Sequence, residues 1–130
     1  MSDMPSLGSW ITIGHPAVAE IMAAAGFDWL TIDLEHSAMS IERAEELIRV
    51  IELSGVKPLV RLSSNNAVQI KRVMDSGAHG VIVPMVKTEN EVRKAIAAVH
   101  YPPLGDRSVG LARAQKYGAG FQKYFEWQKN

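Results

Sequence analysis

The amino-acid sequence predicts an α/β fold made of repeated strand–helix units with parallel strands. A small residue followed by glycine ends an apolar helical stretch three times, at Gly26, Gly55 and Gly77, and helices commonly end at a glycine with left-handed backbone angles. A short apolar run follows each glycine, over residues 29–33, 58–61 and 80–84. These runs are continuously apolar, which is typical of parallel strands buried on both faces.

The remaining elements are placed by helical periodicity and by residues that favour helix starts. The first strand is predicted over residues 9–13, and the first helix over residues 16–25. Helix starts are indicated by Pro16, by Ser40, by Asn65 or Asn66, and by Thr88 with Glu91 in a capping box. The 3.6-residue period gives three apolar stripes: Val18, Ile21, Met22 and Ala25; Ile41, Ala44, Leu47, Ile48 and Ile51; and Val92, Ala95, Ile96 and Val99.

Counting these elements gives four βα units, whereas a complete (β/α)8 TIM barrel has eight units in about 250 residues. We therefore predict the N-terminal half of such a barrel, with four parallel βα units plus a C-terminal helix. Residues 1–130 would be a single partial domain that lacks the second half. The alternative is a small open sheet, which would need helices on both faces.

The open ends of a half barrel predict association. Its first and fourth strands would expose unpaired backbone groups, and such edges favour pairing with another chain. The tail over residues 118–130 carries Phe121, Tyr124 and Phe125 at helical spacing. We expect this aromatic face to lack a barrel to cover and to dock on a neighbouring molecule.

Composition excludes several classes of function. The 14 basic and 14 acidic residues give a net charge of zero, which does not favour nucleic acid or an anionic membrane surface. A membrane span and an export signal are also absent from the pattern, so we expect a cytoplasmic protein. Because there is no cysteine, any metal would be held by oxygen and imidazole ligands, which favours a hard divalent ion.

Chemically reactive residues follow the second and third strands, where barrels of this class place their active sites. Asp33, Glu35 and His36 come directly after the second strand, and a histidine beside carboxylates can act as a base or a metal ligand. Alternatively, the two carboxylates cap the next turn and His36 is a solvated loop residue. Arg61 closes the third strand. It could bind a carboxylate in two-pronged fashion or form a salt bridge inside the barrel mouth.

Other histidines and arginines are less informative. His15 follows the first strand and could edge the pocket, although we favour a role in the loop that leads into a helix. His79 lies in a helix-to-strand turn, and we assign no chemistry to His100. Arg107 and Arg113 flank Gly110 after the fourth helix. They could contact a substrate carboxylate or, as we favour, a neighbouring subunit.

Several pieces of the chain are informative in their order and spacing: residues 26–30, 32–36, 60–61, 69–71, 75–78, 83–86 and 101–103, with Gly105 and Arg107. Together they cover nearly the whole chain and resemble the HpcH/HpaI aldolases. These are metal-dependent pyruvate aldolases related to 4-hydroxy-2-oxoheptanedioate and 2-keto-3-deoxy sugar acid aldolases. The resemblance implies a (β/α)8 barrel and a reversible aldol reaction through a metal-stabilised pyruvate enolate. The partners would be a keto acid and an aldehyde, in a homo-oligomer.

The resemblance also implies roles for individual residues. His36 matches the proton-moving histidine and Asp75 its carboxylate partner, although Asp75 falls at a helix end. It would reach His36 across a subunit contact or merely order the helix. Arg61 matches the arginine that orients pyruvate. Trp10 matches an aromatic residue near the aldehyde end, or packs in the core, and Asp33 and Glu35 would order water around the metal.

The family's metal ligands lie beyond Asn130, which is a departure from the pattern. The full-length family is expected to use Mg²⁺, Mn²⁺ or Co²⁺, and metal binding in this chain is expected to be weak or absent. We expect no metal ligand within the chain and an aldolase-type carbon–carbon lyase that is truncated and inactive alone. The alternative is a non-catalytic half barrel that associates with itself or with a complementary chain.

Overall fold

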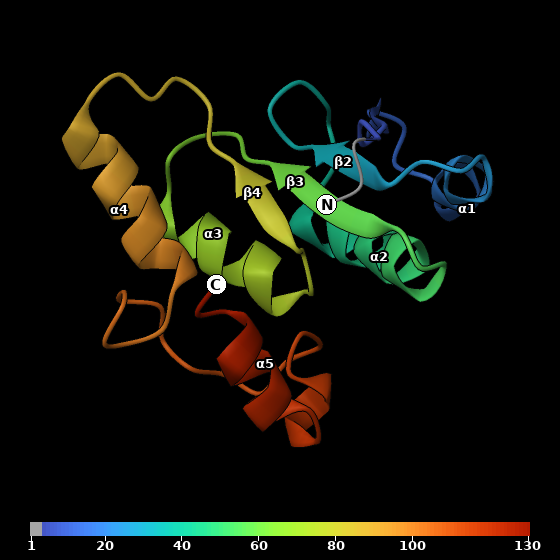
Figure 1. Ribbon diagram of the computed structural model, residues 1–130. Coiled ribbons are helices and arrows are strands. Elements are labelled where there is room, and N and C mark those ends of the chain that lie inside the picture. Colours follow the sequence, from blue (N-terminus) through green and yellow to red (C-terminus); the bar gives the residue numbers. More distant parts are fainter. Residues whose placement is uncertain (1–3) are drawn as a thin grey trace.

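The computed structural model describes residues 4–130 and contains the four predicted βα units (Figure 1). The strands form one parallel sheet in the order β1-β2-β3-β4. The strands are β1 (Gly8–Ile11), β2 (Trp29–Asp33), β3 (Lys57–Arg61) and β4 (Gly80–Ile82). The helices are α1 (Pro16–Ala24), α2 (Ile41–Leu53), α3 (Ala67–Asp75), α4 (Glu89–Val99) and α5 (Phe121–Trp127), with a 3-10 turn η1 (Lys116–Gly118) before α5. The predicted α/β class and the C-terminal helix are confirmed.

Local signals place the helix starts. Ser40 accepts a hydrogen bond from the Arg43 N–H at 3.1 Å, and Thr88 and Glu91 form the predicted capping box. Two backbone N–H groups bind the Glu91 carboxylate and lower its pKa. Asn66 caps α3, whereas Asn65 donates its amide to the carbonyl of Glu91.

The bounds of the first and fourth strands differ from the sequence-based expectation. The fourth strand, β4, ends at Ile82 and not at residue 84. The first strand ends at Ile11 because the chain then turns, with the His15 N–H bonded to the Ile13 carbonyl at 2.9 Å. His15 itself caps α1 through Nδ1, which accepts from the Ala17 N–H at 3.1 Å. The three helix-ending glycines have positive φ angles, as predicted: 94° at Gly26, 82° at Gly55 and 106° at Gly77.

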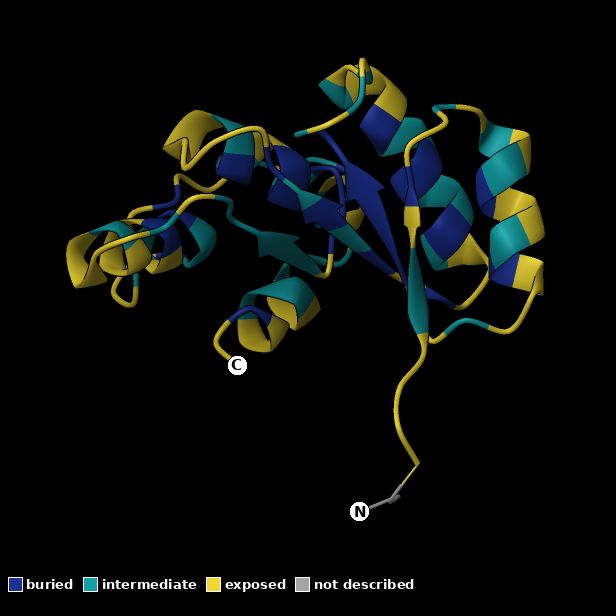
Figure 2. Cartoon of the chain, turned by 90° about the horizontal axis from the view of Figure 1, so that it is seen from above, coloured by how far each residue is buried: buried dark blue, intermediate teal, exposed yellow. Residues whose placement is uncertain are grey.

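The hydrophobic core lies between the sheet and the helices that follow the strands (Figure 2). Ile11, Ile32 and Val60 are at most 1% exposed and point to the helical face, where α2 contributes Leu47 and Ile48. Side chains alternate along a strand, so the neighbouring positions face the other way. That opposite face carries the polar strand ends and is the side on which a barrel would close.

The aromatic tail packs on its own chain, which differs from the expectation that its aromatic face has nothing in the chain to cover. Its docking on a neighbouring molecule stays a prediction. The Tyr101 ring lies 6.1 Å from that of Tyr124 and 6.2 Å from that of Phe125, centroid to centroid. The guanidinium of Arg107 lies 4.3 Å above the Tyr101 ring and donates hydrogen bonds to both tyrosine hydroxyls. The tail thus has an internal partner in the segment after α4.

Arg107 and Arg113 were expected to contact a substrate or a neighbouring subunit. In the structure both side chains are buried within the chain. Arg113 donates to the carbonyl of Ser76 and pairs with Glu52 at 2.5 Å. Burial alone would raise the pKa of Glu52, but the hydrogen bond and charge of Arg113 outweigh it and lower that pKa. Both arginines therefore join the C-terminal segment to the βα units.

No helix within residues 4–130 is long and apolar enough to cross a membrane.

We predict that Gly77→Ala destabilises the fold more than Gly26→Ala. Both glycines have positive φ, which costs an alanine about 1 kcal/mol. A methyl group at Gly77 would also overlap the Arg113 guanidinium, whereas nothing lies within 4 Å at Gly26. Urea unfolding should give a loss of about 1 kcal/mol for Gly26→Ala and about 3 kcal/mol for Gly77→Ala. Equal losses would contradict the steric contribution of Arg113.

Candidate active site

Three strand ends bring the predicted site residues to one face of the sheet. Asp33 ends β2 and lies in register with Arg61, which ends β3. Trp10 on β1 is in register with Thr31, two positions before Asp33 and therefore on the same face. All three side chains occupy the face opposite the helices, near the carboxyl ends of the parallel strands.

The centre of the site is a two-pronged ion pair between Asp33 and Arg61. Nε of Arg61 donates to Oδ1 at 2.9 Å and Nη2 donates to Oδ2 at 2.7 Å. Oδ1 also accepts from the backbone N–H groups of Glu35, at 3.0 Å, and His36, at 3.2 Å. The Arg61 hydrogen bonds, reinforced by these N–H groups, overcome the effect of burial and hold the pKa of Asp33 at about 2.

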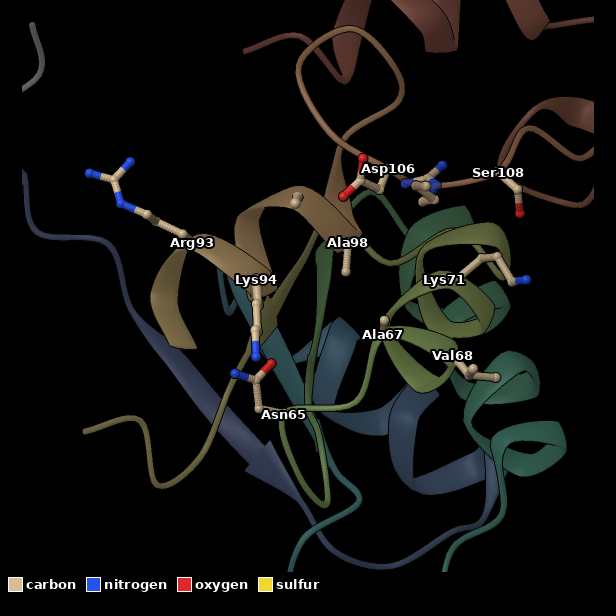
Figure 3. A pocket seen from close by; sticks show the side chains of 11 residues that line it. Asn65, Ala67, Val68, Lys71, Arg93, Lys94, Ala98, Asp106 and Ser108 are labelled. Carbon is tan, nitrogen blue, oxygen red and sulfur yellow. The ribbon is translucent and has the colours of Figure 1, made fainter. Parts of the chain in front are cut away.

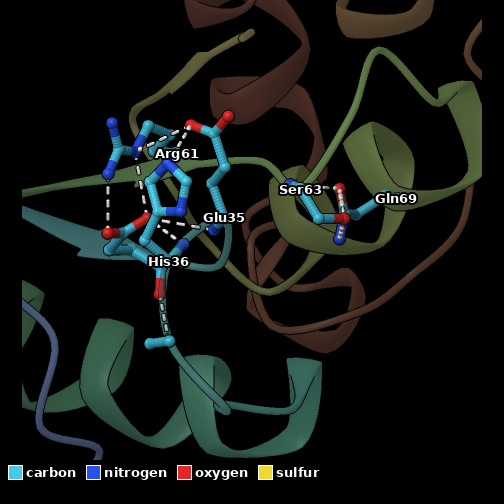
Figure 4. A network of polar contacts seen from close by, with 7 residues as sticks. Glu35, His36, Arg61, Ser63 and Gln69 are labelled. Atoms are coloured by element: carbon cyan, nitrogen blue, oxygen red, sulfur yellow. Dashed lines mark hydrogen bonds and ion pairs between the residues drawn. The ribbon is translucent and has the colours of Figure 1, made fainter.

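Glu35 joins the imidazole of His36 to the guanidinium of Arg61 (Figure 4). Oε2 of Glu35 lies 3.3 Å from Nε of Arg61 and 3.8 Å from Nε2 of His36. The two basic groups therefore point to the same side of the molecule. The His36 side chain is 72% exposed, so its ring is open to a ligand at the mouth.

The contacts of Asp33 that cap the following turn also set the geometry of the site. The alternative interpretation of the sequence had Asp33 and Glu35 both capping the next turn. Asp33 does cap the turn at residues 35–36, whereas the Glu35 carboxylate pairs with Arg61, and Arg61 forms the salt bridge that its own alternative proposed. The Ser37 hydroxyl also donates to the Asp33 carbonyl. This anchoring fixes the backbone from which Glu35 and His36 project. Asp33 thus stabilises the turn and also helps to position the two basic groups, Arg61 and His36.

Trp10 covers one face of the Arg61 guanidinium, and one nitrogen of that group stays open to a ligand. The centre of the guanidinium lies 4.6 Å above the indole ring, which covers one of its faces, and such stacking holds a guanidinium plane in place. Nε and Nη2 are occupied by carboxylates, whereas Nη1 makes no hydrogen bond within residues 4–130. This nitrogen can donate to an anionic ligand.

Gln69 anchors the loop that follows Arg61, a role that the sequence analysis did not assign. Its Oε1 accepts from the Ser63 N–H at 3.1 Å, and its Nε2 donates to the Ser63 hydroxyl at 2.9 Å (Figure 4). The only sequence signal was the place of Gln69 in the family resemblance. The loop contact joins residues six positions apart and follows no helical or strand period.

The structure does not bring Asp75 together with His36 in one chain. Asp75 ends α3, and since α3 runs back along the sheet, its last residue lies by the amino ends of the strands. Its Oδ1 lies 3.5 Å from Nη2 of Arg107 and 3.4 Å from Nε2 of Gln115. Burial raises the pKa of Asp75, opposed by the charge of Arg107.

The described residues do not fit a metal site by themselves. Nowhere in residues 4–130 are three or more histidine, aspartate or glutamate side chains grouped so that they could hold an ion. Both oxygens of Asp33 are bound to Arg61, and Glu35 is paired with Arg61 and His36. Hard divalent ions require several oxygen ligands.

Comparison with known proteins assigns the chain to a family. A sequence profile described as HpcH/HpaI aldolase/citrate lyase matches residues 6–121. The chain belongs to this family. It is 43% identical over 114 residues to a hydroxypyruvate/pyruvate aldolase of Sagittula stellata, covering 87% of this chain and 45% of that protein. It is 42% identical over 115 residues to a 4-hydroxy-2-oxo-heptane-1,7-dioate aldolase of Salmonella dublin, covering 87% and 44%.

Solved structures agree with this assignment. A HpcH/HpaI aldolase/citrate lyase family protein from Burkholderia cenocepacia matches with a TM-score of 0.85 and 29% identity, over 93% of this chain and 50% of that one. The citrate synthase SbnG matches with a TM-score of 0.79 and 32% identity, over 93% and 48%. The chain thus spans about half the length of the relatives it matches, and its four βα units correspond to half of a TIM barrel.

We predict that Asp33 stabilises the fold only at pH values at which its carboxyl group is ionised. Its pKa in the folded chain, about 2, is below the ordinary 3.8, so the stabilisation is complete above pH 3.8 and is lost as the pH falls toward about 2. Urea unfolding across this range should show a steeper loss in the parent than in Asp33→Asn. Glu20→Gln, which changes an exposed carboxylate on α1, should follow the parent. Identical slopes for parent and Asp33→Asn would contradict the assignment.

Proposed function

We propose that Trp10, Asp33, Glu35, His36 and Arg61 form the keto-acid part of a pyruvate aldolase site. The reaction would be reversible cleavage of a 2-keto-3-deoxy or 4-hydroxy-2-oxo acid to pyruvate and an aldehyde. The observation that supports it is the convergence of Arg61 and His36 on one oxygen of Glu35, with Nη1 of Arg61 open. Relatives named as aldolases of pyruvate and of a 4-hydroxy-2-oxo acid support the same reaction class.

In this proposal Arg61 binds the anionic end of the keto acid. Its Nη1 donates to the carboxylate or to the developing enolate oxygen, and its positive charge balances the negative charge that forms there. Asp33 keeps the guanidinium in one orientation, because a two-pronged pair fixes both its position and its plane. Trp10 limits movement on one face and forms the wall toward the aldehyde.

His36 moves the proton. In the cleavage direction the imidazole takes the proton of the C4 hydroxyl, the C3–C4 bond breaks, and its electron pair forms the pyruvate enolate while C4 becomes the aldehyde carbon. Return of a proton to C3 then gives pyruvate. Glu35, whose Oε2 lies 3.8 Å from Nε2, orients the ring for this step.

Asp75 and a divalent metal ion also take part in the proposed reaction, but the described residues place neither of them beside His36. Asp75 lies by the other ends of the strands, so it can assist His36 only from a neighbouring subunit of a homo-oligomer. A divalent ion, Mg²⁺, Mn²⁺ or Co²⁺, is proposed for the full-length family, where it would stabilise enolate charge. Since the described residues do not fit such an ion, we propose that the 130-residue chain binds it weakly and is inactive alone.

A second candidate is a non-catalytic half barrel that associates with itself or with a complementary chain. The free outer sides of β1 and β4 favour it, since each strand pairs on one side only within the described residues. The two candidates differ in whether the strand ends bind a keto acid.

We predict that the chain binds pyruvate through Arg61 without turning it over. NMR titration with pyruvate should shift the signals of residues 33–36 and 61, and Arg61→Ala should weaken binding roughly tenfold or more because a charge-assisted hydrogen bond is lost. The matched control is Arg93→Ala, which removes an exposed arginine paired with Glu89 on α4. No binding by the parent would contradict the proposal and leave the non-catalytic alternative.

The second part of the proposal is tested by exchange of pyruvate C3 protons with deuterated water, with Mg²⁺ or Mn²⁺ added. The expected result is no exchange above that of the metal alone. Fast exchange by the parent, lost in His36→Ala, would overturn the statement that the chain is inactive alone while supporting the role of His36.

A further inference from the structure

A groove on the outer surface of the helical layer lies between α3 and α4 and encloses about 540 Å³ (Figure 3). We call it the α3–α4 groove. Hydrogen bonds tie its walls together at both ends. At the start of the two helices the Asn65 amide donates to the Glu91 carbonyl at 3.0 Å, and at the end of α4 the Asp106 N–H donates to the Ala97 carbonyl at 2.7 Å. The groove is therefore bounded by residues 65–108 alone, and its volume is in the range of sites for small ligands.

Positive charge lines both walls of the α3–α4 groove. Lys71 projects from α3 and Lys94 from α4 (Figure 3). Neither lysine forms an ion pair with a carboxylate of residues 4–130, whereas Arg93 is paired with Glu89 and points away from the other side chains of the groove. Asp106 is the single acidic residue among those that line it. The groove therefore favours an anion.

A third positive charge lies beneath the groove. The side chain of Arg107 lines the groove and is fully buried. Its Nη1 donates to the Val99 carbonyl, and its Nη2 donates to the hydroxyls of Tyr101 and Tyr124. Its Nε makes no hydrogen bond in the part of the chain that the structure describes, and a buried donor without a partner is uncommon in folded proteins. Asp75 balances the charge of Arg107 only from 3.5 Å.

The surface between these charges is apolar. Ala67 on α3 and Ala97 and Ala98 on α4 line the groove with methyl groups, and Val68 at its rim is 60% exposed. A bare inorganic ion would leave this surface in water. A ligand with a carbon part would cover it and gain the free energy of apolar burial.

We propose that the α3–α4 groove binds a small organic phosphate, with the phosphate group between Lys71 and Lys94 and the carbon part over the alanines. A phosphate monoester carries close to two negative charges at neutral pH, which match the two lysines, while Arg107 adds its charge from below. The residues proposed to bind the keto acid lie at the strand ends, on the face of the sheet opposite the helices. The two sites are therefore separate, and this proposal does not depend on keto-acid binding.

The test is an NMR titration of the purified chain with propyl phosphate. Amide signals of residues 65–71, 94–98 and 106–108 should shift, together with the Nε–H signal of Arg107. The signals of residues 33–36, which are expected to respond to pyruvate, should stay in place. The Arg107 signal is decisive, because an anion held loosely by exposed lysines would leave this buried group unchanged.

The variants Lys71→Gln and Lys94→Gln should each weaken binding roughly fivefold or more, since each loses a charge-assisted contact with the phosphate. The matched control is Lys57→Gln, which changes an exposed lysine at the start of β3 and should bind as the parent does. The dispersion of the amide spectra should show that all three variants remain folded.

Four results would overturn the proposal. These are no binding by the parent, an unmoved Arg107 signal, an equal loss of affinity in Lys57→Gln, and binding of inorganic phosphate or succinate as tight as that of propyl phosphate. The last comparison separates an organic phosphate from a bare anion and from a dicarboxylate of similar size.

Discussion

The site depends on one constraint, the in-register pairing of two parallel strands that end in opposite charges. Asp33 and Arg61 are 28 positions apart in sequence, yet the ladder between β2 and β3 sets them side by side. Because the pair is anchored at both oxygens, Asp33 can also hold the backbone of Glu35 and His36. Strand register thereby determines where the imidazole and the guanidinium point.

Much of this arrangement could be predicted from the sequence because its causes are local. Helix-ending glycines, caps such as Ser40, and continuous apolar strands act over a few residues, and together they indicate parallel βα units. Parallel units bring the carboxyl ends of strands together, so the proximity of Asp33 and Arg61 follows from their positions. The boundaries of the first strand were less accessible, since the turn after Ile11 depends on a backbone contact between Ile13 and His15.

The segment after α4 could not be predicted in the same way. Arg107 contacts Tyr101 and Tyr124, and the Gln128 side chain accepts from the Tyr101 N–H. These partners are separated by irregular chain, where no period relates one residue to the next. The aromatic spacing of α5 predicted a helix correctly but contained no information on which surface would cover it. The apolar stripe of α4 shows the same limit, since Ala95 is buried while Val92 and Ile96 on that stripe are exposed. Periodicity identifies an apolar face without identifying its neighbours.

The order of the strands has a consequence for synthesis. Each strand after β1 pairs with the one that precedes it in the chain, while α2 packs on β2 and β3 and α3 packs on β4. Each unit can therefore add to a completed neighbour as it leaves the ribosome, since domains generally fold from the N-terminus during translation. Asp33 and Arg61 would meet once the third strand has emerged, so the rim of the barrel forms early and the remaining units are added to an existing template.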